Sequence, residues 1–379
     1  MNRLQRYLFT SVFMTSAWAV LVFAFVLLAG NVVKDLIGAL AAGQISFQTF
    51  FRLTAMLVPF VVSYALPMGI LTGILLVLGR LSAQHEITAM RAAGLGLVRI
   101  SSPIFLVAIL GLALSLIFNL ELGPRSKAGY RAELADAVRN NPLSFIVPRT
   151  FIRDFPGYVI FVSEKEDNEI RSLWIWELDK ENRVLKFVRA EEGRVDFDEA
   201  RVSLNLTLFN GQTEFRSTRD PEDFSETRPV LAFESASVAL PLEKVLGKSS
   251  FRRKLTWMTF SELMAERRRV IENEAALPAR EVFEQRVTLQ YAMQGSFVMA
   301  FAVLSFAMVG VPLGIKMQRR ESSANLGLAL VLSMGFYFIL IVIDWAQKMP
   351  DLRPDLLLWA PNLIFQSAGL WLFLRVDRQ

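Results

Sequence analysis

Six long segments of this chain carry almost no charge, and this feature limits what the chain can fold into more than any other. They are Leu8–Gly30, Leu53–Leu78, Ser101–Leu120, Ser296–Gly314, Leu326–Ala346 and Leu356–Leu374. A helix needs about 20 predominantly apolar residues to cross the hydrocarbon core of a bilayer. Asp344 is the single acidic or basic residue in all six segments. We therefore predict six transmembrane helices, with one large domain between the third and the fourth.

The charge of the chain is typical of a membrane protein rather than of a nucleic-acid-binding protein. Hydrophobic residues make up 53% of the 379 residues, and the mean hydropathy of +0.38 is high for a soluble domain. The net charge is +5, but no basic run carries interleaved aromatic residues. The basic residues gather instead at the ends of the apolar segments, as membrane topology requires. We expect no nucleic-acid partner.

The distribution of Lys and Arg predicts which side of the membrane each segment end faces. One set of ends carries Arg3, Arg6, Arg80, Arg91, Arg99, Lys316, Arg319, Arg320, Arg375 and Arg378. The short loops at the opposite ends carry only Lys34, Arg52, Lys348 and Arg353. Short cytoplasmic loops are enriched in basic residues. Both termini are therefore predicted in the cytoplasm, and the long stretch between the third and fourth segments outside it.

That long stretch has the pattern of short β-strands. Tyr158–Val162 and Leu173–Leu178 are compact apolar runs, and Val202–Leu208 alternates apolar with polar residues. Such alternation is typical of a half-buried strand in an antiparallel sheet, and the pair Asn210-Gly211 favours a turn. The predicted fold class is a membrane α-helical bundle with an inserted extracytoplasmic all-β domain, built as a sandwich or jelly roll.

Four parts follow along the chain. Residues 1–122 hold the first three transmembrane helices, with a short cytoplasmic helix at about residues 82–93. Residues 123–255 form the β-domain, and residues 256–294 form a helical connector in which Thr259–Glu262 is a capping box. Residues 295–379 hold the last three transmembrane helices.

The chain lacks the residues that most enzyme mechanisms need. It has no cysteine, and His85 is its one histidine, which excludes thiol chemistry, Ser-His-Asp catalysis and His-rich metal sites. Gly247-Lys248-Ser249 resembles the end of a phosphate-binding loop, but Leu242 stands where that motif needs glycine. We expect no catalytic residue, no metal and no cofactor, so the chain is not predicted to be an enzyme.

The loop between the second and third apolar segments is the most informative part of the chain. Ser82 can cap a short helix there and Gly94 can stop it, with Glu86 near the positive N-terminal end. One apolar stripe at helical spacing comprises Ala83, Ile87, Met90 and Gly94. Two interpretations remain open from this pattern: a plain interfacial connector, or a coupling helix that a cytosolic motor grips.

This loop, the order of the helices and the outer β-domain together resemble the LptF/LptG family of lipopolysaccharide-export permeases. The strongest local similarity is the run Glu86-Ile87-Thr88-Ala89-Met90-Arg91-Ala92-Ala93-Gly94-Leu95. Three further similar segments are Arg6-Tyr7-Leu8, Val311-Pro312-Leu313-Gly314 and Leu358-Trp359-Ala360-Pro361-Asn362-Leu363-Ile364. The resemblance covers nearly the whole chain and is weakest in the β-domain. The Asn141-Pro142 region and the outer loop before Trp359 resemble the LptF side.

The resemblance implies a location, a mechanism and partners. Family members are multi-pass proteins of the bacterial inner membrane, surrounded by membrane lipids, with a periplasmic β-domain. Two such permeases pair around a cavity, and a cytosolic ABC ATPase dimer grips their coupling helices. Lipopolysaccharide drawn from the inner membrane is passed into the β-domain and on to a periplasmic bridge protein with a related β-domain. ATP hydrolysis would then belong to the separate partner.

The resemblance also implies two groups of site residues. The ATPase-coupling group is Glu86, Ile87, Met90 and Arg91, in which Glu86 matches the family's coupling-helix glutamate. The substrate-binding group is Asn31 and Lys34, at the outer end of the first helix, where family members carry basic residues near the lipid A phosphates. The alternative to a permease is a membrane-anchored periplasmic assembly or adaptor protein without transport. A secondary transporter is disfavoured, since few ionisable residues lie at membrane depth.

Overall fold

The structure of the protein, a computed structural model, describes residues 2–41, 45–140, 146–153, 155, 157–166, 169–179, 181–198, 203–216, 229–241, 255–272, 278–316 and 322–377. The chain forms two compact units. The helical unit comprises Met1–Lys34, Thr54–Tyr130 and Arg253–Gln379, and the β unit comprises Asp35–Leu53 and Arg131–Arg252.

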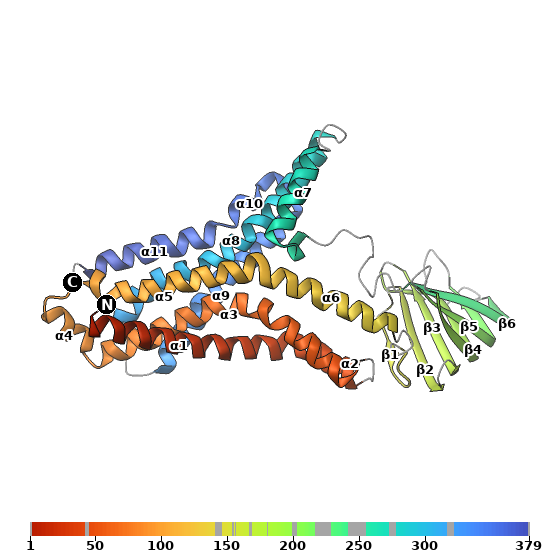
Figure 1. Cartoon of the computed structure of the whole chain (residues 1–379). Helices are drawn as coiled ribbons and strands as arrows, with labels where there is room; N and C mark the ends of the chain where they lie inside the picture. Colours follow the sequence, from red (N-terminus) through yellow and green to blue (C-terminus); the bar gives the residue numbers. More distant parts are fainter. Residues whose placement is uncertain are drawn as a thin grey trace. The chain divides into compact units, whose positions relative to one another are not determined.

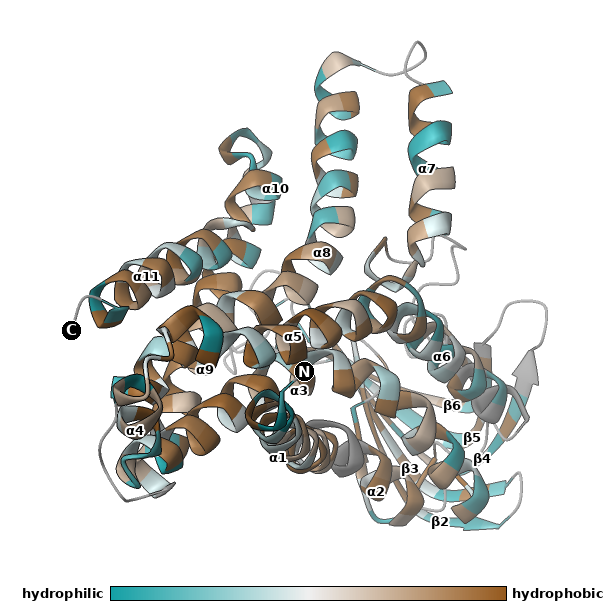
Figure 2. Ribbon diagram, turned by 60° about the vertical axis from the view of Figure 1, so that its left-hand side comes forward, coloured by the Kyte–Doolittle hydropathy of each residue, from teal (hydrophilic) through white to brown (hydrophobic). Residues whose placement is uncertain are grey.

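Within the described residues, six helices are long and apolar enough to cross a membrane, as predicted. They are α1 (Arg3–Leu27), α3 (Phe47–Ala83), α5 (Leu97–Ile117), α8 (Ala279–Lys316), α9 (Ser322–Trp345) and α11 (Ala360–Asp377) (Figure 1). Figure 2 shows long hydrophobic stretches on these helices, whereas the first turns of α8 alternate between hydrophilic and hydrophobic colours. Helix α8 is continuous, so the end of the predicted connector and the fourth spanning segment share one helix.

Shorter elements join these helices. They are η1 (Leu28–Val33), α2 (Lys34–Ala41), α4 (Glu86–Ala92), η2 (Phe118–Leu122), α6 (Gly123–Asn140), η5 (Leu255–Trp257), α7 (Phe260–Glu272), η7 (Ala346–Lys348), η8 (Pro350–Leu352) and α10 (Pro354–Leu357). The capping box predicted at the start of α7 is confirmed. The Thr259 N–H donates to the Glu262 carboxylate at 2.9 Å, and the Glu262 N–H donates to Thr259 Oγ1 at 3.4 Å.

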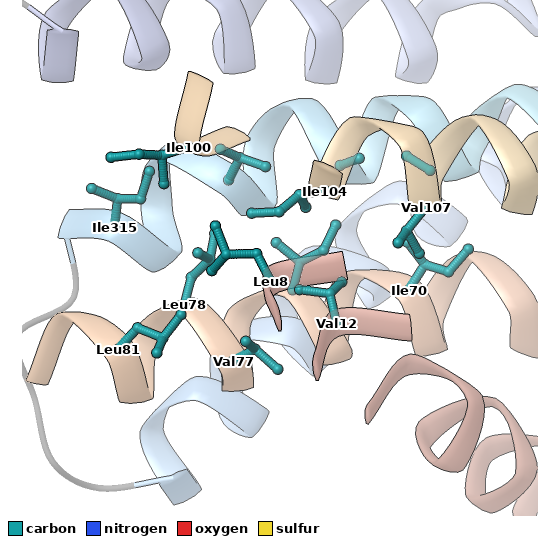
Figure 3. Packing of buried hydrophobic residues seen from close by; sticks show 14 of the residues in the cluster. Leu8, Val12, Ile70, Val77, Leu78, Leu81, Ile100, Ile104, Val107 and Ile315 are labelled. Carbon is teal, nitrogen blue, oxygen red and sulfur yellow. The ribbon is translucent and has the colours of Figure 1, made fainter. Parts of the chain in front are cut away.

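The core of the helical unit lies where α1, α3, α5 and α8 meet. Figure 3 shows Leu8 and Val12 of α1 between side chains of α3 and α5. Leu8, Val12 and Ile104 are fully buried in this cluster, and Ile315 joins it from the end of α8. In a bilayer, burial of such side chains against one another gains little hydrophobic free energy, so close packing holds the helices together.

Two glycines four residues apart allow α1 and α3 to approach closely. A Cβ atom on Gly69 would lie 2.6 Å from the backbone nitrogen of Val20, and one on Gly73 would lie 2.7 Å from that of Ser16. Real Cβ atoms do not come that near to backbone. This is the close backbone approach that small residues spaced four apart permit between membrane helices.

The β unit contains a six-stranded antiparallel sheet in its described part. The strands are β1 (Phe151–Ile152), β2 (Tyr158–Glu166), β3 (Glu169–Leu178), β4 (Val184–Asp198), β5 (Ser203–Phe215) and β6 (Val230–Pro241). Their order in the sheet is their order in the chain, so the described strands form a meander. The inserted all-β domain is therefore confirmed, and the described strands carry the connections of a meander rather than the crossed connection of a Greek key.

One face of this sheet carries the apolar core of the β unit. Ile160, Ile175 and Leu206 are at most 1% exposed and belong to one cluster. The turn predicted at Asn210-Gly211 is wrong, because both residues lie inside β5. Asn210 takes a left-handed φ of 50°, yet the pairing with β4 and β6 keeps its register on both sides. Asn tolerates this conformation, and so the pair lies within the strand without ending it.

Candidate functional site

Helix α4 sits in the predicted loop, with boundaries different from those expected. It runs from Glu86 to Ala92, and His85 with a left-handed φ of 59° occupies the N-cap position. The prediction that Ser82 caps this helix is wrong. Ser82 lies in the last turn of α3, where its buried hydroxyl donates to the carbonyl of Ile315 at 2.7 Å. Gly94, with a φ of 84°, ends the helix as predicted.

The inner face of α4 packs into the helical unit. Ile87 is 3% exposed and belongs to the same buried cluster as Leu97, Ile100 and Val376. Met90 packs against this cluster and is partly buried. Two of the four predicted coupling residues, Ile87 and Met90, therefore hold α4 against the start of α5 and the end of α11.

Arg91 also points inward, toward the carboxyl end of α11. Its guanidinium donates to the carbonyls of Val376 and Asp377, each at 3.4 Å. The last carbonyls of a helix have no partner within the helix and carry a partial negative charge, which favours a cation at this place. Arg91 thus ties the last turn of α4 to the last turn of α11.

The outer face of α4 carries the remaining predicted coupling residue. Thr88, Ala89 and Ala92 are exposed, and Glu86 is half-buried in the first turn. A carboxylate in the first turn is stabilised by the partial positive charge of the helix N-terminus. The helix therefore offers one small, exposed surface with a carboxylate at one end.

A buried polar network then joins α11 to α8. The Ser305 hydroxyl donates to Asn362 Oδ1 at 2.6 Å, and the Asn362 amide donates to the carbonyl of Val298 at 3.0 Å. Gln366 Nε2 donates to the Ser305 oxygen at 3.0 Å. Hydrogen bonds between membrane helices are worth about 0.6–2 kcal/mol each, and this group of three holds α11 on α8.

This network was not predicted from the sequence, although the sequence contains a signal for it. Asn362 and Gln366 are polar residues inside an otherwise apolar segment, where an unsatisfied amide costs several kcal/mol. Their presence alone indicates partners on a neighbouring helix. The identity of those partners required the structure.

The predicted substrate-binding residues lie near a change of helix type. Asn31 is in η1, a π-helical segment that continues α1, and Lys34 begins α2. The side chains of both residues fall outside those that the structure describes. Their role stays a prediction.

Comparison with known proteins agrees with this architecture. The family described as "Lipopolysaccharide export system permease LptF/LptG" matches residues 6–375. The chain is similar to the lipopolysaccharide export system permease protein LptF of Escherichia coli (strain K12), with 22% identity over 337 residues that cover 88% of this chain and 85% of the relative. LptF of Shigella flexneri gives the same values. LptG of Haemophilus influenzae is 24% identical over 156 residues, 40% of this chain and 42% of the relative.

The family match covers both the helices and the inserted sheet, so it does not depend on a single motif. The longer similarity to LptF agrees with the features that resemble the LptF side. The chain therefore belongs to the LptF/LptG family of lipopolysaccharide export system permeases.

Proposed function

We propose that this chain is the permease subunit of an ATP-driven exporter that extracts lipopolysaccharide from the inner membrane. The lipopolysaccharide would pass into the periplasmic β unit and then to a bridge protein with a related β-domain. The observation that carries the proposal is the two-sided construction of α4. Its inner face is fixed to the helical unit by Ile87 and Arg91, while its outer face is exposed and carries Glu86. A plain connector has no need of both features.

The proposed partners are a second permease and a cytosolic ABC ATPase dimer. Relatives of this chain include proteins named LptF and LptG, which supports a pair of different permeases. The ATPase would contact the exposed face of α4, with Glu86 as its charged contact. A force on α4 would reach α11 through Arg91 and Ile87, and α8 through the network around Asn362. Coupling between distant sites travels through such contiguous packed and hydrogen-bonded elements.

The β unit has the chemistry that acyl chains need outside the membrane. Exposing acyl chains to water costs about 0.8 kcal/mol per methylene. The apolar interior of the β unit, which buries Ile175 and Leu206, would lower that cost for an acyl chain that entered it. We propose that this interior opens to the lipid on its path from the membrane to the bridge protein.

Purification from membranes tests the proposed function against the adaptor alternative. If the chain is a permease, it should copurify with a cytosolic ATPase and with lipopolysaccharide, because the substrate is held while the motor is bound. An adaptor would retain a periplasmic partner through the β unit and lack the ATPase. Finding the periplasmic partner alone, under conditions that preserve the second permease, would exclude the exporter.

The proposed topology can be tested with single thiols, because the chain contains no cysteine. Ser235 in β6 and Ser323 at the start of α9 are both exposed. A membrane-impermeant thiol reagent applied to spheroplasts should label Ser235→Cys and spare Ser323→Cys, as the distribution of basic residues predicts. After lysis both variants should be labelled, which controls for reactivity. The reverse pattern in intact spheroplasts would reject the topology.

We also propose that Asn31 and Lys34 meet a lipid A phosphate at the outer end of α1. An ammonium group serves as a point charge for phosphate, and one such charge near a membrane surface is worth about 1 kcal/mol. Lys34→Glu should therefore reduce lipopolysaccharide copurification about fivefold or more, while Lys34→Arg stays close to wild type. A photoreactive residue at position 31 measures the contact. Equal crosslinking in the wild type and the Glu variant would show that Lys34 is only a membrane anchor.

A further inference from the structure

An apolar groove lies on the surface of the helical unit between α5 and α11. Its volume is about 630 Å³. The lining is almost entirely apolar and comes from four helices: Gln5 of α1, Val98, Ser102, Pro103, Phe105, Leu106 and Ile109 of α5, Met308 of α8, and Gly369, Leu370 and Phe373 of α11. None of these residues belongs to α4 or to the α8–α11 polar network.

The groove exists because both walls pack on the same helix. Gly369 brings α11 against the backbone of α8, since a Cβ atom there would lie 2.6 Å from the carbonyl oxygen of Met308. Met308 forms the floor, and the rings of Phe105 and Phe373 lie 6.4 Å apart between the two walls. Val98, Ile109 and Leu370 are each more than half exposed along the opening. The groove is thus open to the surrounding lipid rather than closed inside the bundle.

Its length matches one leaflet of a bilayer. Val98 and Ile109 mark its ends on α5, and eleven helical steps correspond to about 16 Å. Half of a hydrocarbon core is about 15 Å thick. Val98 is in the first turn of α5 and Gln5 in the first turn of α1, so the groove begins at one membrane surface. A single acyl chain running inward from that surface would fill it.

The surface end of the groove is flanked by positive charge. Arg6 follows the lining residue Gln5, and Arg99 lies one helical turn before Ser102 and Pro103. Both arginines are exposed. Basic residues beside a crevice between membrane helices favour anionic headgroups at their level. A lipid without net charge would gain only the apolar contacts.

We propose that the groove binds one acyl chain of an anionic phospholipid, whose phosphate lies at the level of Arg6 and Arg99. The phospholipid belongs to the leaflet at which α1 and α5 begin. This site differs from the proposed export path in its place and in its ligand. Lipid binding in this groove requires only that the helices span a membrane, and it does not depend on the proposed export activity.

Photolabelling of the full chain with its partners in lipid nanodiscs tests the proposal. Two probes carry the same diazirine acyl chain, one on phosphatidylglycerol and the other on phosphatidylethanolamine. Mass spectrometry should find label on peptides spanning 98–109 and 369–373, preferentially from phosphatidylglycerol. Each basic residue near the surface contributes roughly a fivefold preference, so Arg6→Gln with Arg99→Gln should lower phosphatidylglycerol labelling about 25-fold. Arg80→Gln should leave the label unchanged, because exposed Arg80 is in the last turn of α3 and no residue of α3 lines the groove.

A second pair of variants tests the groove itself. Leu106 lines it, whereas Leu110, one turn further along α5, is exposed but outside it. Leu106→Trp should fill the groove and remove the label, and Leu110→Trp should keep it. Equal labelling by both probes, unaffected by the arginine variants, would mean ordinary annular lipid and overturn the proposal. The proposal would also be overturned if lipopolysaccharide displaced the probe. A crosslink from residues that line the groove to a protein helix would overturn it as well.

Discussion

Glu86→Ala should leave the chain inserted and folded, while its association with the cytosolic ATPase falls by roughly 30- to 4,000-fold. The reason is the position of Glu86 in the first turn of α4, at the edge of its exposed face. Truncating one partner of a desolvated, hydrogen-bonded charge pair costs about 2–5 kcal/mol, much of it from the charge left unpaired. The measurement is the dissociation constant of the ATPase for the purified permease pair at fixed salt concentration.

Two companion variants make this result specific. Glu86→Gln keeps the shape and removes the charge, so it should reproduce most of the loss if charge pairing is responsible. Thr88→Ala changes the same exposed face without touching a charge, and it should stay within about threefold of the wild type, as surface substitutions usually do. An Ala variant that binds the ATPase at full strength and exports normally would reduce Glu86 to a surface residue of a connector.

Arg91→Gln should have a different effect: the ATPase still binds, but less lipopolysaccharide is exported for each ATP hydrolysed. Arg91 donates to the end of α11 and is turned away from the exposed face of α4. Changes along such a connecting network alter coupling by about 0.5–2 kcal/mol, which corresponds to roughly 2- to 30-fold. The measurement is the ratio of lipopolysaccharide release to phosphate release in proteoliposomes that contain the complete exporter.

The control for Arg91 is an arginine at the same membrane surface. Arg80 is exposed in the last turn of α3, and Arg80→Gln should leave the ratio unchanged. Arg91→Lys keeps a cation that can reach one carbonyl of α11 and should restore part of the coupling. If Arg91→Gln instead weakens ATPase binding, as Glu86→Ala should, then Arg91 contacts the ATPase directly and its hydrogen bonds to α11 do not transmit movement.

Together, Glu86→Ala and Arg91→Gln distinguish binding of the ATPase from transmission of its movement to the membrane helices. Glu86 and Arg91 lie in one short helix, five residues apart in the sequence, but Arg91 donates to the end of α11 whereas the proposed role of Glu86 is at the exposed face. Sequence similarity grouped them as one coupling site with Ile87 and Met90. In the structure, Glu86 lies in the half-buried first turn, whereas Ile87, Met90 and Arg91 hold α4 in place.

The sequence alone determined the features of this protein that depend on a local pattern. A bilayer requires an apolar helix of fixed length, so the six spans could be predicted from charge-free segments, and all six are present in the described residues. The inserted all-β domain followed from apolar runs and alternation within single strands. The start of α7 followed from the capping box at Thr259, since both of its hydrogen bonds join residues three apart.

Only the tertiary structure decided what depends on contacts between distant parts of the chain. Serine is a common N-cap residue, but the Ser82 hydroxyl donates to a carbonyl 233 residues away in the sequence. The Arg91 guanidinium likewise donates to a carbonyl 285 residues away. The turn predicted at Asn210-Gly211 became part of a strand because pairing on both sides outweighed a local preference. No local sequence pattern predicts the groove between α5 and α11, because residues of four helices line it. Local propensities are worth tenths of a kcal/mol to about 1 kcal/mol per residue, and packing and hydrogen bonding across the fold override them.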